Sequence, residues 1–321
     1  MGAEEAVRPP ALQPGDLVAV VSPAGPARPE LVAAGVALLR SWGLRPVPAP
    51  HAFDRHGYLA GTDADRVGDL NAAFADPEVR GIIVTRGGYG THRIVDRIDW
   101  AAARRDPKPV VGCSDITALQ LALWRGARLA GLHGPGAAWR PERTGPGSAQ
   151  ALRDALMSPE RVVVKQEPAA VTGGVSRLGP PLPAGTTGLP GVVTGRLLGG
   201  NLSVLTATLG THDFPDLTGA ILLIEDVAEP PYKVDRMLTQ LRRSGVLSRL
   251  AGVAVGQFVR CTDQWATDIA EVLDERLRDL AVPVLGGLPI GHGAEPVTVP
   301  VGVPAMLDVP AGTLTVSPAV R

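Results

Sequence analysis

Short apolar runs alternate with amphipathic segments along the first part of this 321-residue chain, and that alternation limits the folds open to it. Leu17-Val18-Ala19-Val20-Val21 and Gly81-Ile82-Ile83-Val84 are continuous apolar runs, typical of parallel strands buried on both faces. Helical periodicity over 29–42 and 63–74, with a short strand near 45–47, separates them. Right-handed crossovers then predict an open parallel sheet of Rossmann-like or flavodoxin-like type, which binds ligands beyond the carboxyl ends of its strands.

The second part of the chain again mixes strands and helices. Ala220-Ile221-Leu222-Leu223-Ile224-Glu225-Asp226 is an apolar run that ends in two acids, and an amphipathic helix is expected over 232–243. A strand at 252–256 and a helix near 267–280 follow. The tail from 297 to 316 alternates short apolar stretches with turns, which is typical of antiparallel strands. We therefore expect an α/β protein whose C-terminal domain is mixed and contains short antiparallel strands.

A glycine- and proline-rich stretch separates these two parts. Between 141 and 193 the chain contains Gly145-Pro146-Gly147, Gly179-Pro180-Pro181 and several similar breaks, with one short helix expected near 149–156. The predicted division is an N-terminal domain over 1–140, a linker over 141–193 and a C-terminal domain over 194–321.

Composition excludes several functional classes. Lys plus Arg number 31 and Asp plus Glu 32, so no basic surface for nucleic acid or for an anionic membrane is expected. The two cysteines have no metal-binding or redox spacing. The N-terminus lacks the apolar core of a secretory signal, and no apolar stretch reaches the ~18–20 residues of a membrane helix. We expect a cytoplasmic protein.

A strand, a sharp turn and a helix are predicted around Ser114. Val110-Val111-Gly112 reads as a strand, and the amphipathic stretch 115–124 reads as the helix. A hydroxyl at such a turn lies at the carboxyl edge of the sheet, where free helix N–H groups can stabilise a developing anion. Ile116 replaces the second glycine of the Gly-x-Ser-x-Gly nucleophile motif. Ser114 is therefore either a nucleophile or an ordinary N-cap serine.

The loop Arg86-Gly87-Gly88-Tyr89-Gly90-Thr91 directly follows a predicted strand. Its glycines let the backbone approach a ligand closely with N–H groups pointing outward. A helix carrying Ile94, Val95 and Ile98 is expected next. The dinucleotide pattern Gly-x-Gly-x-x-Gly fails because Arg93 occupies its last position, so a plain glycine turn competes with a functional loop.

A serine nucleophile needs a base and an acid that orients it. His292 lies between two glycines after an apolar run, and Glu225 continues an apolar run expected to be buried, where a carboxylate needs a partner. The alternatives are a surface-loop histidine and a strand-terminal acid that reaches solvent. No metal-binding motif or phosphate loop is present, so we expect neither a metal nor a cofactor. What remains is a serine hydrolase with Ser114, Glu225 and His292 in chain order.

At this point the chain resembles a known family, the LD-carboxypeptidases or muramoyltetrapeptide carboxypeptidases, together with the related microcin C immunity hydrolases. The resemblance extends over nearly the whole chain. Cys113 stands where the family usually has an aromatic residue, which leaves the packing of the pocket open. The matching motifs are Gly15-Asp16, Val20-Val21-Ser22-Pro23-Ala24, Arg86-Gly87-Gly88-Tyr89-Gly90, Gly112-Cys113-Ser114-Asp115-Ile116-Thr117, His133-Gly134-Pro135, Gly199-Gly200-Asn201-Leu202, Glu225-Asp226, Pro231-Tyr232-Lys233-Val234-Asp235-Arg236 and Gly291-His292-Gly293.

The resemblance implies a catalytic triad shared by two domains. Ser114 would be the nucleophile, His292 the base and then the acid, and Glu225 the residue that orients the histidine. The backbone N–H groups of Gly88 and Asp115 would form the oxyanion hole, and each such donor is typically worth ~10²–10³ in rate.

The same resemblance implies a substrate and an assembly. Arg86, Gly87 and Tyr89 are candidate substrate-binding residues. Family members release the terminal D-alanine of a cell-wall tetrapeptide by cutting an L,D-amide bond, a recycling reaction of the cytoplasm, and they usually form homodimers. The expected partner is thus a small peptide, not a nucleic acid or a membrane.

Other functions stay open on the sequence. An immunity-type hydrolase would cut a peptidyl or aminoacyl nucleotide and would need an aromatic surface for the base, which Trp139 could supply. A third option is recruitment to another amide or ester in secondary metabolism. A binder without turnover and an NAD-dependent enzyme are further alternatives, the first opposed by the intact Ser114, Glu225 and His292 and the second by the mismatched glycine pattern.

Overall fold

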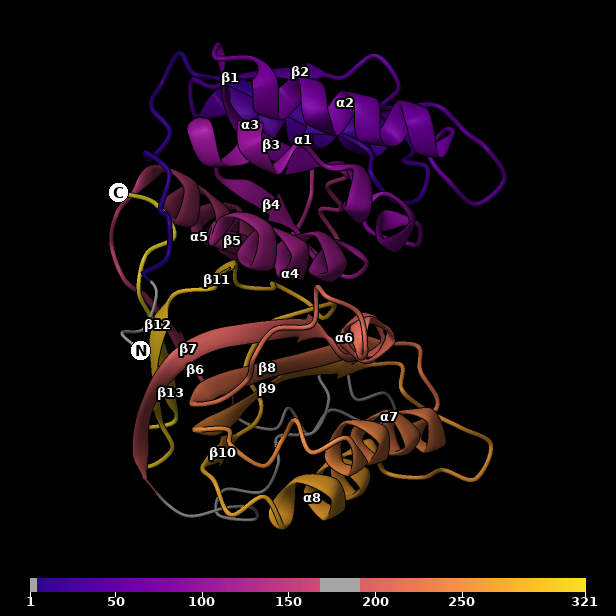
Figure 1. Ribbon diagram of the computed structural model, residues 1–321, viewed down its shortest axis with the longest axis vertical. Helices are drawn as coiled ribbons and strands as arrows, with labels where there is room; N and C mark the ends of the chain where they lie inside the picture. Colours follow the sequence, from indigo (N-terminus) through magenta and orange to yellow (C-terminus); the bar gives the residue numbers. More distant parts are fainter. Residues whose placement is uncertain (1–4, 168–190) are drawn as a thin grey trace.

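A computed structural model describes residues 5–167 and 191–321 of the chain. Two β-sheets lie one above the other along the long axis, and helices cover them (Figure 1). The expected two-part α/β fold is confirmed.

The upper sheet has six strands, and all but one run parallel. The internal strands are short and mostly apolar, as the continuous runs predict for a sheet covered on both faces. In spatial order they are β11 (Val299–Val301), β5 (Gly131–His133), β4 (Val110–Gly112), β3 (Val79–Val84), β1 (Leu17–Val21) and β2 (Arg45–Pro48).

Helices pack on both faces of this upper sheet. Val18 and Val20 of β1 share a core with α1 (Pro29–Ser41) and α5 (Pro146–Met157). Val21, next along the same strand, packs on the other face in a core with the remaining helices. Those are α2 (Asp63–Ala75), α3 (Trp100–Arg105) and α4 (Ile116–Ala127).

The lower sheet is mixed, as expected. Its strands are β10 (Val284–Leu285), β9 (Gly252–Val259), β8 (Ala220–Val227), β7 (Val192–Asn201), β12 (Pro304–Asp308), β13 (Thr313–Val316) and β6 (Val162–Lys165), in that order. The first four run parallel, and the last three pair antiparallel. One face is covered by α6 (Leu202–Thr208), α7 (Pro231–Arg243) and α8 (Ile269–Arg278).

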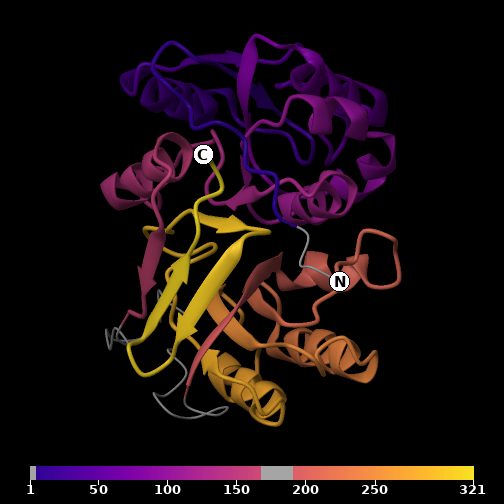
Figure 2. The same ribbon diagram turned by 60° about the vertical axis from the view of Figure 1, so that its left-hand side comes forward.

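The expected open parallel sheet carries one additional antiparallel strand at its edge. Strand β11, from the C-terminal part of the chain, pairs antiparallel with β5, with Val299 opposite His133. Pro300 lies within this strand, where an edge position tolerates the missing N–H. Figure 2 shows the yellow C-terminal strands next to the upper half, where the C-terminus also lies. Arg321 N–H there donates to the Pro9 carbonyl at 2.9 Å.

The helix expected after the glycine loop is also different. Two short 3₁₀ turns, η1 (Thr91–Arg93) and η2 (Val95–Arg97), stand there, and α3 begins only at Trp100. Ile94, Val95 and Ile98 are nevertheless buried, so the apolar spacing predicted the buried face but not the type of helix.

The proposed linker contains regular structure where it is described. Helix α5 packs on the upper sheet and β6 joins the lower one, whereas residues 168–190, with Gly173-Gly174 and Gly179-Pro180-Pro181, lie outside the described residues. One core cluster runs through both sheets, from Val18 of β1 to Leu223 of β8. The three-part domain division stays a prediction. Within 5–167 and 191–321, no helix is long and apolar enough to cross a membrane.

Candidate active site

Ser114 lies at a sharp turn between β4 and α4. Its φ is 63°, in the left-handed region that a side chain rarely adopts, so the turn is a strained strand-to-helix connection. The N-cap of α4 is Asp115, and no side chain caps this end of the helix. The alternative of an N-cap serine is therefore wrong. The strain holds Ser114 at the pocket surface, as a nucleophile elbow does.

Helix α4 fixes this turn because it is buried almost all round. Ten of its 12 residues are buried, which marks a helix packed between layers. Gln120 Nε2 donates to the carbonyls of Gly112 and Leu132, both at 2.9 Å, at the ends of the two neighbouring strands. The position of Ser114 is thus set by the sheet and the helix together.

The glycine loop packs directly against this turn. A Cβ added at Gly87 would lie 2.7 Å from Ser114 Cβ and 3.1 Å from Ser114 Oγ. Gly88 has a φ of 127°, which favours glycine. The Asp115 carboxylate accepts a hydrogen bond from Thr91 N–H at 2.8 Å and so attaches the loop to the first turn of α4.

A buried arginine that the sequence did not point to supports the loop from behind. Arg66, on α2, is only 1% exposed. Its Nη1 donates to the carbonyl of Gly90 at 2.9 Å and also to the carbonyl of Pro23. One side chain thereby joins the ends of two loops next to Ser114.

Glu225 and His292 are brought together by the lower sheet. Glu225 Oε2 lies 2.6 Å from His292 Nδ1, and the carboxylate is fully buried. The strand register shifts between Ile224 and Asp226, and such a bulge redirects a side chain. Burial alone would raise the pKa of Glu225, but the charge and hydrogen bond of His292, aided by Asn201, lower that pKa below its usual range.

The loop that carries His292 is attached to β9. Gln257 Oε1 accepts from Gly293 N–H at 2.7 Å, and Gln257 N–H donates to the Ile290 carbonyl at 2.8 Å. A Cβ at Gly291 would lie 2.5 Å from Glu225 Oε2, so only glycine allows this approach. Gly291 thus makes room for the carboxylate that contacts His292.

A hydrogen-bonded link joins helix α4, which follows Ser114, to Glu225 and Asp226. Thr117 Oγ1, one turn after Ser114, accepts from Asn201 N–H at 3.0 Å. Asn201 Nδ2 donates to Asp226 Oδ1 at 3.0 Å and lies 3.4 Å from Glu225 Oε1. The two sheets therefore meet at the site through one asparagine.

His133 lies on the far side of the carboxylate. It is fully buried at the end of β5, with Nε2 3.7 Å from Glu225 Oε1, and neither ring nitrogen has a hydrogen-bond partner among residues 5–167 and 191–321. Burial lowers the pKa of His133, and the charge of His292 acts in the same direction, against the pull of Glu225. The ring is therefore held neutral beside the acid.

This neutral histidine predicts an acid-sensitive fold. In the unfolded chain His133 binds a proton below about pH 6.5, whereas in the folded chain its lowered pKa keeps the ring neutral to lower pH. The free energy of unfolding therefore keeps its full value above that pH and decreases as the pH falls below it. We expect the melting temperature of His133→Leu to fall less between pH 7 and 5.5 than that of the wild type, measured by scanning calorimetry. His56→Gln, at an exposed position, should keep the wild-type slope. Equal slopes for all three proteins would contradict the assignment.

Ser114 and His292 line one pocket of about 380 Å³ between the two sheets. Gly87, Gly88 and Arg86 line it as well, whereas Tyr89 is 51% exposed and packs on Tyr58, with ring centroids 5.6 Å apart. Five arginines are among the lining residues: Arg28, Arg86, Arg140, Arg143 and Arg260. These lining residues include no Asp or Glu, although the whole chain has a formal charge of −1.

Cys113, the departure from the family pattern, also lines this pocket. Burial, and then the charge of Glu225, raises the pKa of its thiol to about 12. The thiol stays protonated at neutral pH and does not compete with Ser114 as a nucleophile. Trp139, considered as an aromatic surface for a base, is 7% exposed and packs in the core.

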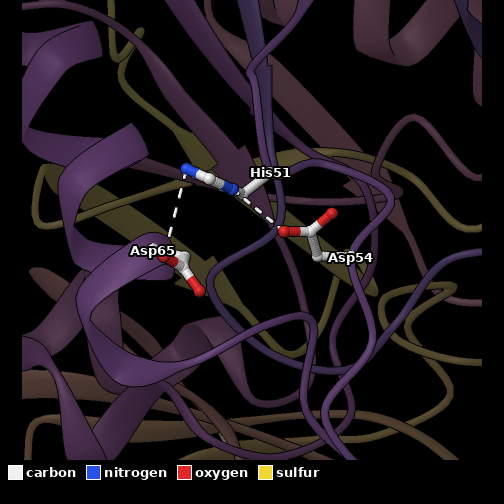
Figure 3. A group of neighbouring side chains, drawn as sticks. All are labelled: His51, Asp54 and Asp65. Carbon is white, nitrogen blue, oxygen red and sulfur yellow. Dashed lines mark hydrogen bonds and ion pairs between the residues drawn. The ribbon is translucent and has the colours of Figure 1, made fainter.

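Two groups of side chains outside the pocket have spacings that could hold a cation. Figure 3 shows His51 between Asp54 and Asp65, at 2.9 Å and 4.0 Å from its two ring nitrogens. The hydrogen bond that the Asp54 carboxylate accepts from the His51 ring raises the pKa of His51. Asp65 already accepts from Thr62 N–H at 3.0 Å in the capping box of α2, so these contacts serve the fold. The other group is Asp96, His212 and Asp213.

The close packing of Gly87 predicts a sensitive position. Gly87→Ala places a methyl group 2.7 Å from Ser114 Cβ and 2.9 Å from the Cys113 carbonyl, so the serine must move. Displacement of about 1 Å typically costs ~10²-fold in rate, and we expect kcat/KM to fall by about that factor. Gly68→Ala is the control, because its helical Cβ meets nothing within 4 Å. That variant should keep full activity and gain up to ~1 kcal/mol of stability. An active Gly87→Ala enzyme would show that Ser114 is not held by this contact.

Two family models match the chain. One describes the LD-carboxypeptidase N-terminal domain and matches residues 18–134, and the other describes the LD-carboxypeptidase C-terminal domain and matches residues 194–307. The chain belongs to the LD-carboxypeptidase family. The resemblance seen in the motifs is thereby confirmed.

Relatives extend over almost the entire chain. A putative carboxypeptidase of Streptomyces coelicolor is 45% identical over 97% of this chain and 96% of its own length. The murein tetrapeptide carboxypeptidase of Pseudomonas aeruginosa is 33% identical over 91% of this chain and 92% of its own. As an LD-carboxypeptidase with such relatives, the protein is a serine-type carboxypeptidase.

Solved structures share the fold. The muramoyltetrapeptide carboxypeptidase of Oxalobacter formigenes aligns with a TM-score of 0.78 at 30% identity, covering 94% of this chain and 97% of that one. The microcin C7 self-immunity protein, in its wild-type apo state, aligns with a TM-score of 0.84 at 23% identity and covers 97% and 98%. At that identity the second likeness concerns the fold alone.

Proposed function

We propose that this LD-carboxypeptidase releases the terminal D-alanine of a murein tetrapeptide by hydrolysing an L,D-amide bond, with Ser114, His292 and Glu225 as its catalytic triad. The observation that carries the proposal is the pocket in which a strained Ser114 and a His292 held by buried Glu225 face the same space. A relative that is 33% identical bears the name murein tetrapeptide carboxypeptidase, which supports the choice of substrate.

In the proposed mechanism His292 Nε2 removes the proton of Ser114 Oγ as the oxygen attacks the scissile carbonyl. Glu225, bonded to Nδ1, keeps the proton on that nitrogen and leaves Nε2 free to accept. The protonated His292 then gives its proton to the departing amine of D-alanine, which leaves an acyl-enzyme. A water molecule, deprotonated by the same histidine, releases the shortened peptide.

The oxyanion of each tetrahedral intermediate needs donors on the side opposite the histidine. We assign the N–H groups of Gly88 and Asp115 to this task. Gly88 is held in a glycine-only conformation beside Ser114's neighbour Gly87, and Asp115 opens α4, whose dipole favours negative charge. Arg86, Gly87 and Tyr89 are the proposed substrate contacts of the same loop.

The immunity-type alternative has weaker support. It requires an aromatic surface for a nucleobase in the pocket, and Trp139 is packed in the core instead. The exposed Tyr58 and Tyr89 pair lies outside the lining residues. A nucleotide conjugate is therefore included in the test as the competing substrate.

Mass spectrometry of purified protein incubated with a murein tetrapeptide tests the proposal, beside a peptidyl-aspartyl nucleotide and Ser114→Ala as the inactive control. Release of D-alanine by the wild type alone is the expected result. Cleavage of only the nucleotide conjugate would transfer the protein to the immunity type. Cleavage of neither would reject the murein reaction.

We further propose that the enzyme works in the cytoplasm as a homodimer, which follows from the family resemblance and from the recycled substrate. Light scattering of the purified protein should give twice the chain mass of 33.3 kDa. Fractionation of the producing cells should place the activity with cytoplasmic markers. A monomeric mass or a membrane-bound activity would reject the respective part.

A further inference from the structure

The pocket concentrates positive charge far beyond what the composition predicts. The chain has 31 basic and 32 acidic residues, yet the lining contains five arginines and no acid. Surface arginines normally find carboxylates, as Arg28 does with Glu30 at 3.7 Å. In the described residues, Arg86, Arg140 and Arg143 form no ion pair. Such a set of unneutralised cations in a pocket attracts anionic ligands.

Two of these arginines are held by a tight turn. Thr144 Oγ1 donates to the Arg140 carbonyl at 2.7 Å and accepts from Arg140 N–H at 2.9 Å. Glu295 N–H donates to the Arg143 carbonyl at 2.8 Å, which attaches the turn to the loop of His292. The Glu295 carboxylate accepts instead from Ser148 N–H at 2.8 Å, and among the described residues the guanidinium of Arg143 forms no ion pair with it. Arg143 Nε is buried and unpaired.

Arg86 is the arginine next to the proposed oxyanion hole. Its Nη2 lies 3.7 Å from the position of a Cβ on Gly88, so the guanidinium sits beside the loop that faces Ser114. The desolvation of this guanidinium lowers the pKa of Arg86, and the charges of Arg140 and Arg28 lower it further. Arg86 and Arg140 therefore share one pocket, which Arg143 also lines, and a bound anion would relieve the repulsion between their charges.

The substrate of the proposed reaction carries an anion that must enter this space. In a peptide whose last residue is removed, the terminal carboxylate is two bonds from the scissile nitrogen. When the scissile carbonyl lies at Ser114, this short separation places the terminal carboxylate inside the same pocket. A guanidinium matches a carboxylate with two parallel hydrogen bonds, whereas a lysine offers only a point charge.

We infer that Arg86, with Arg140 and Arg143, forms a carboxylate subsite that holds the free C-terminal carboxylate of the departing residue. The inference rests on the proposed carboxypeptidase reaction and names the side chains that restrict it to terminal residues. An internal peptide bond would place an uncharged amide against three unpaired cations and would leave them unsatisfied. The subsite thereby makes the enzyme remove one residue at a time.

The test compares two substrates that differ at one group, a murein tetrapeptide with a free terminal carboxylate and the same peptide as its terminal carboxamide. All other carboxylates are identical, so the ratio of the two kcat/KM values reports on the terminal one alone. We expect the wild type to prefer the acid by roughly 10- to 150-fold, the range for hydrogen bonds to charged groups. Arg86→Met should lose this preference by slowing only the acid, and Arg86→Lys should retain part of it.

Arg40→Met is the matched control, because Arg40 is exposed on α1 away from the lining residues. It should keep the wild-type ratio. If the wild type cleaves both peptides equally, or if Arg86→Met slows both by the same factor, the subsite is rejected while the carboxypeptidase reaction stands. If Arg86 only supported the fold, Arg86→Met would slow the cleavage of both peptides by the same factor.

Binding measurements on an inactive variant test the subsite independently of the proposed reaction. On the Ser114→Ala background, calorimetry should show that the acid binds at least 10-fold more tightly than the amide, and Arg86→Met should abolish the difference. If the wild type cleaves neither peptide but this preference is present, the proposed reaction fails and the subsite stands. Equal binding of acid and amide, or no binding of the acid, overturns the subsite whatever the turnover.

Discussion

Ser114→Ala should fold as the wild type does and lose roughly 10⁶-fold in kcat, because triad residues act as a unit and the remaining pair has no nucleophile to activate. Among the described residues Ser114 Oγ forms no hydrogen bond, so its removal leaves no polar partner unsatisfied. Release of D-alanine, followed by mass spectrometry, measures the loss. Ser41→Ala, at an exposed serine that ends α1, should keep full activity.

A second variant separates the chemistry of Ser114 from its strained backbone. Ser114→Gly removes the same hydroxyl but suits a φ of 63°, so it should be as inactive as Ser114→Ala and about 1 kcal/mol more stable. Thermal unfolding gives the comparison. Wild-type turnover in either variant would exclude Ser114 as the nucleophile, whereas equal stabilities would show that the turn stores no strain.

Glu225→Gln should lower kcat by roughly 10⁴-fold with little change in KM. The amide would donate to His292 Nδ1, which then has to accept, so the ring proton moves to Nε2 and blocks the nitrogen that must take the serine proton. The substituted side chain keeps its shape in a fully buried position, and substrate binding in the pocket is untouched.

Steady-state kinetics with the tetrapeptide separates kcat from KM for this variant. Glu78→Gln, at an exposed position, serves as the matched control and should behave as the wild type. A large rise in KM at constant kcat would assign Glu225 to substrate binding. Unchanged kinetics would mean that His292 finds its orientation elsewhere.

The parts of the fold visible in the sequence are those in which burial imposes a local pattern. Strand β1 is apolar throughout, and β3 and β8 each contain a run of at least four apolar or glycine residues, because both faces of these strands are covered. Strand β11 carries no such pattern, since three residues with a central proline are too short for any period. Its partner lies more than 160 residues away in the chain, so only the folded structure identifies the pair.

The candidate site, like the fold, contains some residues that a local sequence pattern predicts and others that only the folded structure identifies. Ser114, Glu225 and His292 each stand at the end of an apolar run, where a sheet edge is expected, and the structure brings the last two into contact. Arg140 and Arg143 stand in no sequence pattern that predicts a site. Their proposed role depends on the lining of the pocket, which contains no Asp or Glu, and only the folded structure shows that lining. Asn201 was part of a motif, but its bonds to Thr117 and Asp226 depend on how the sheets meet. Such contacts join distant segments, and no spacing predicts them.

The antiparallel pairing of β11 with β5 has a consequence for the way the enzyme is made. A ribosome that has synthesised residues 1–280 has produced Ser114, the glycine loop and Glu225, but neither His292 nor the strand that completes the first sheet. Domains generally fold during synthesis from the N-terminus. A nascent chain can therefore order Ser114, the proposed nucleophile, well before it contains His292, the proposed base. On the proposed mechanism, the order of translation thus delays peptide hydrolysis until the two sheets have joined.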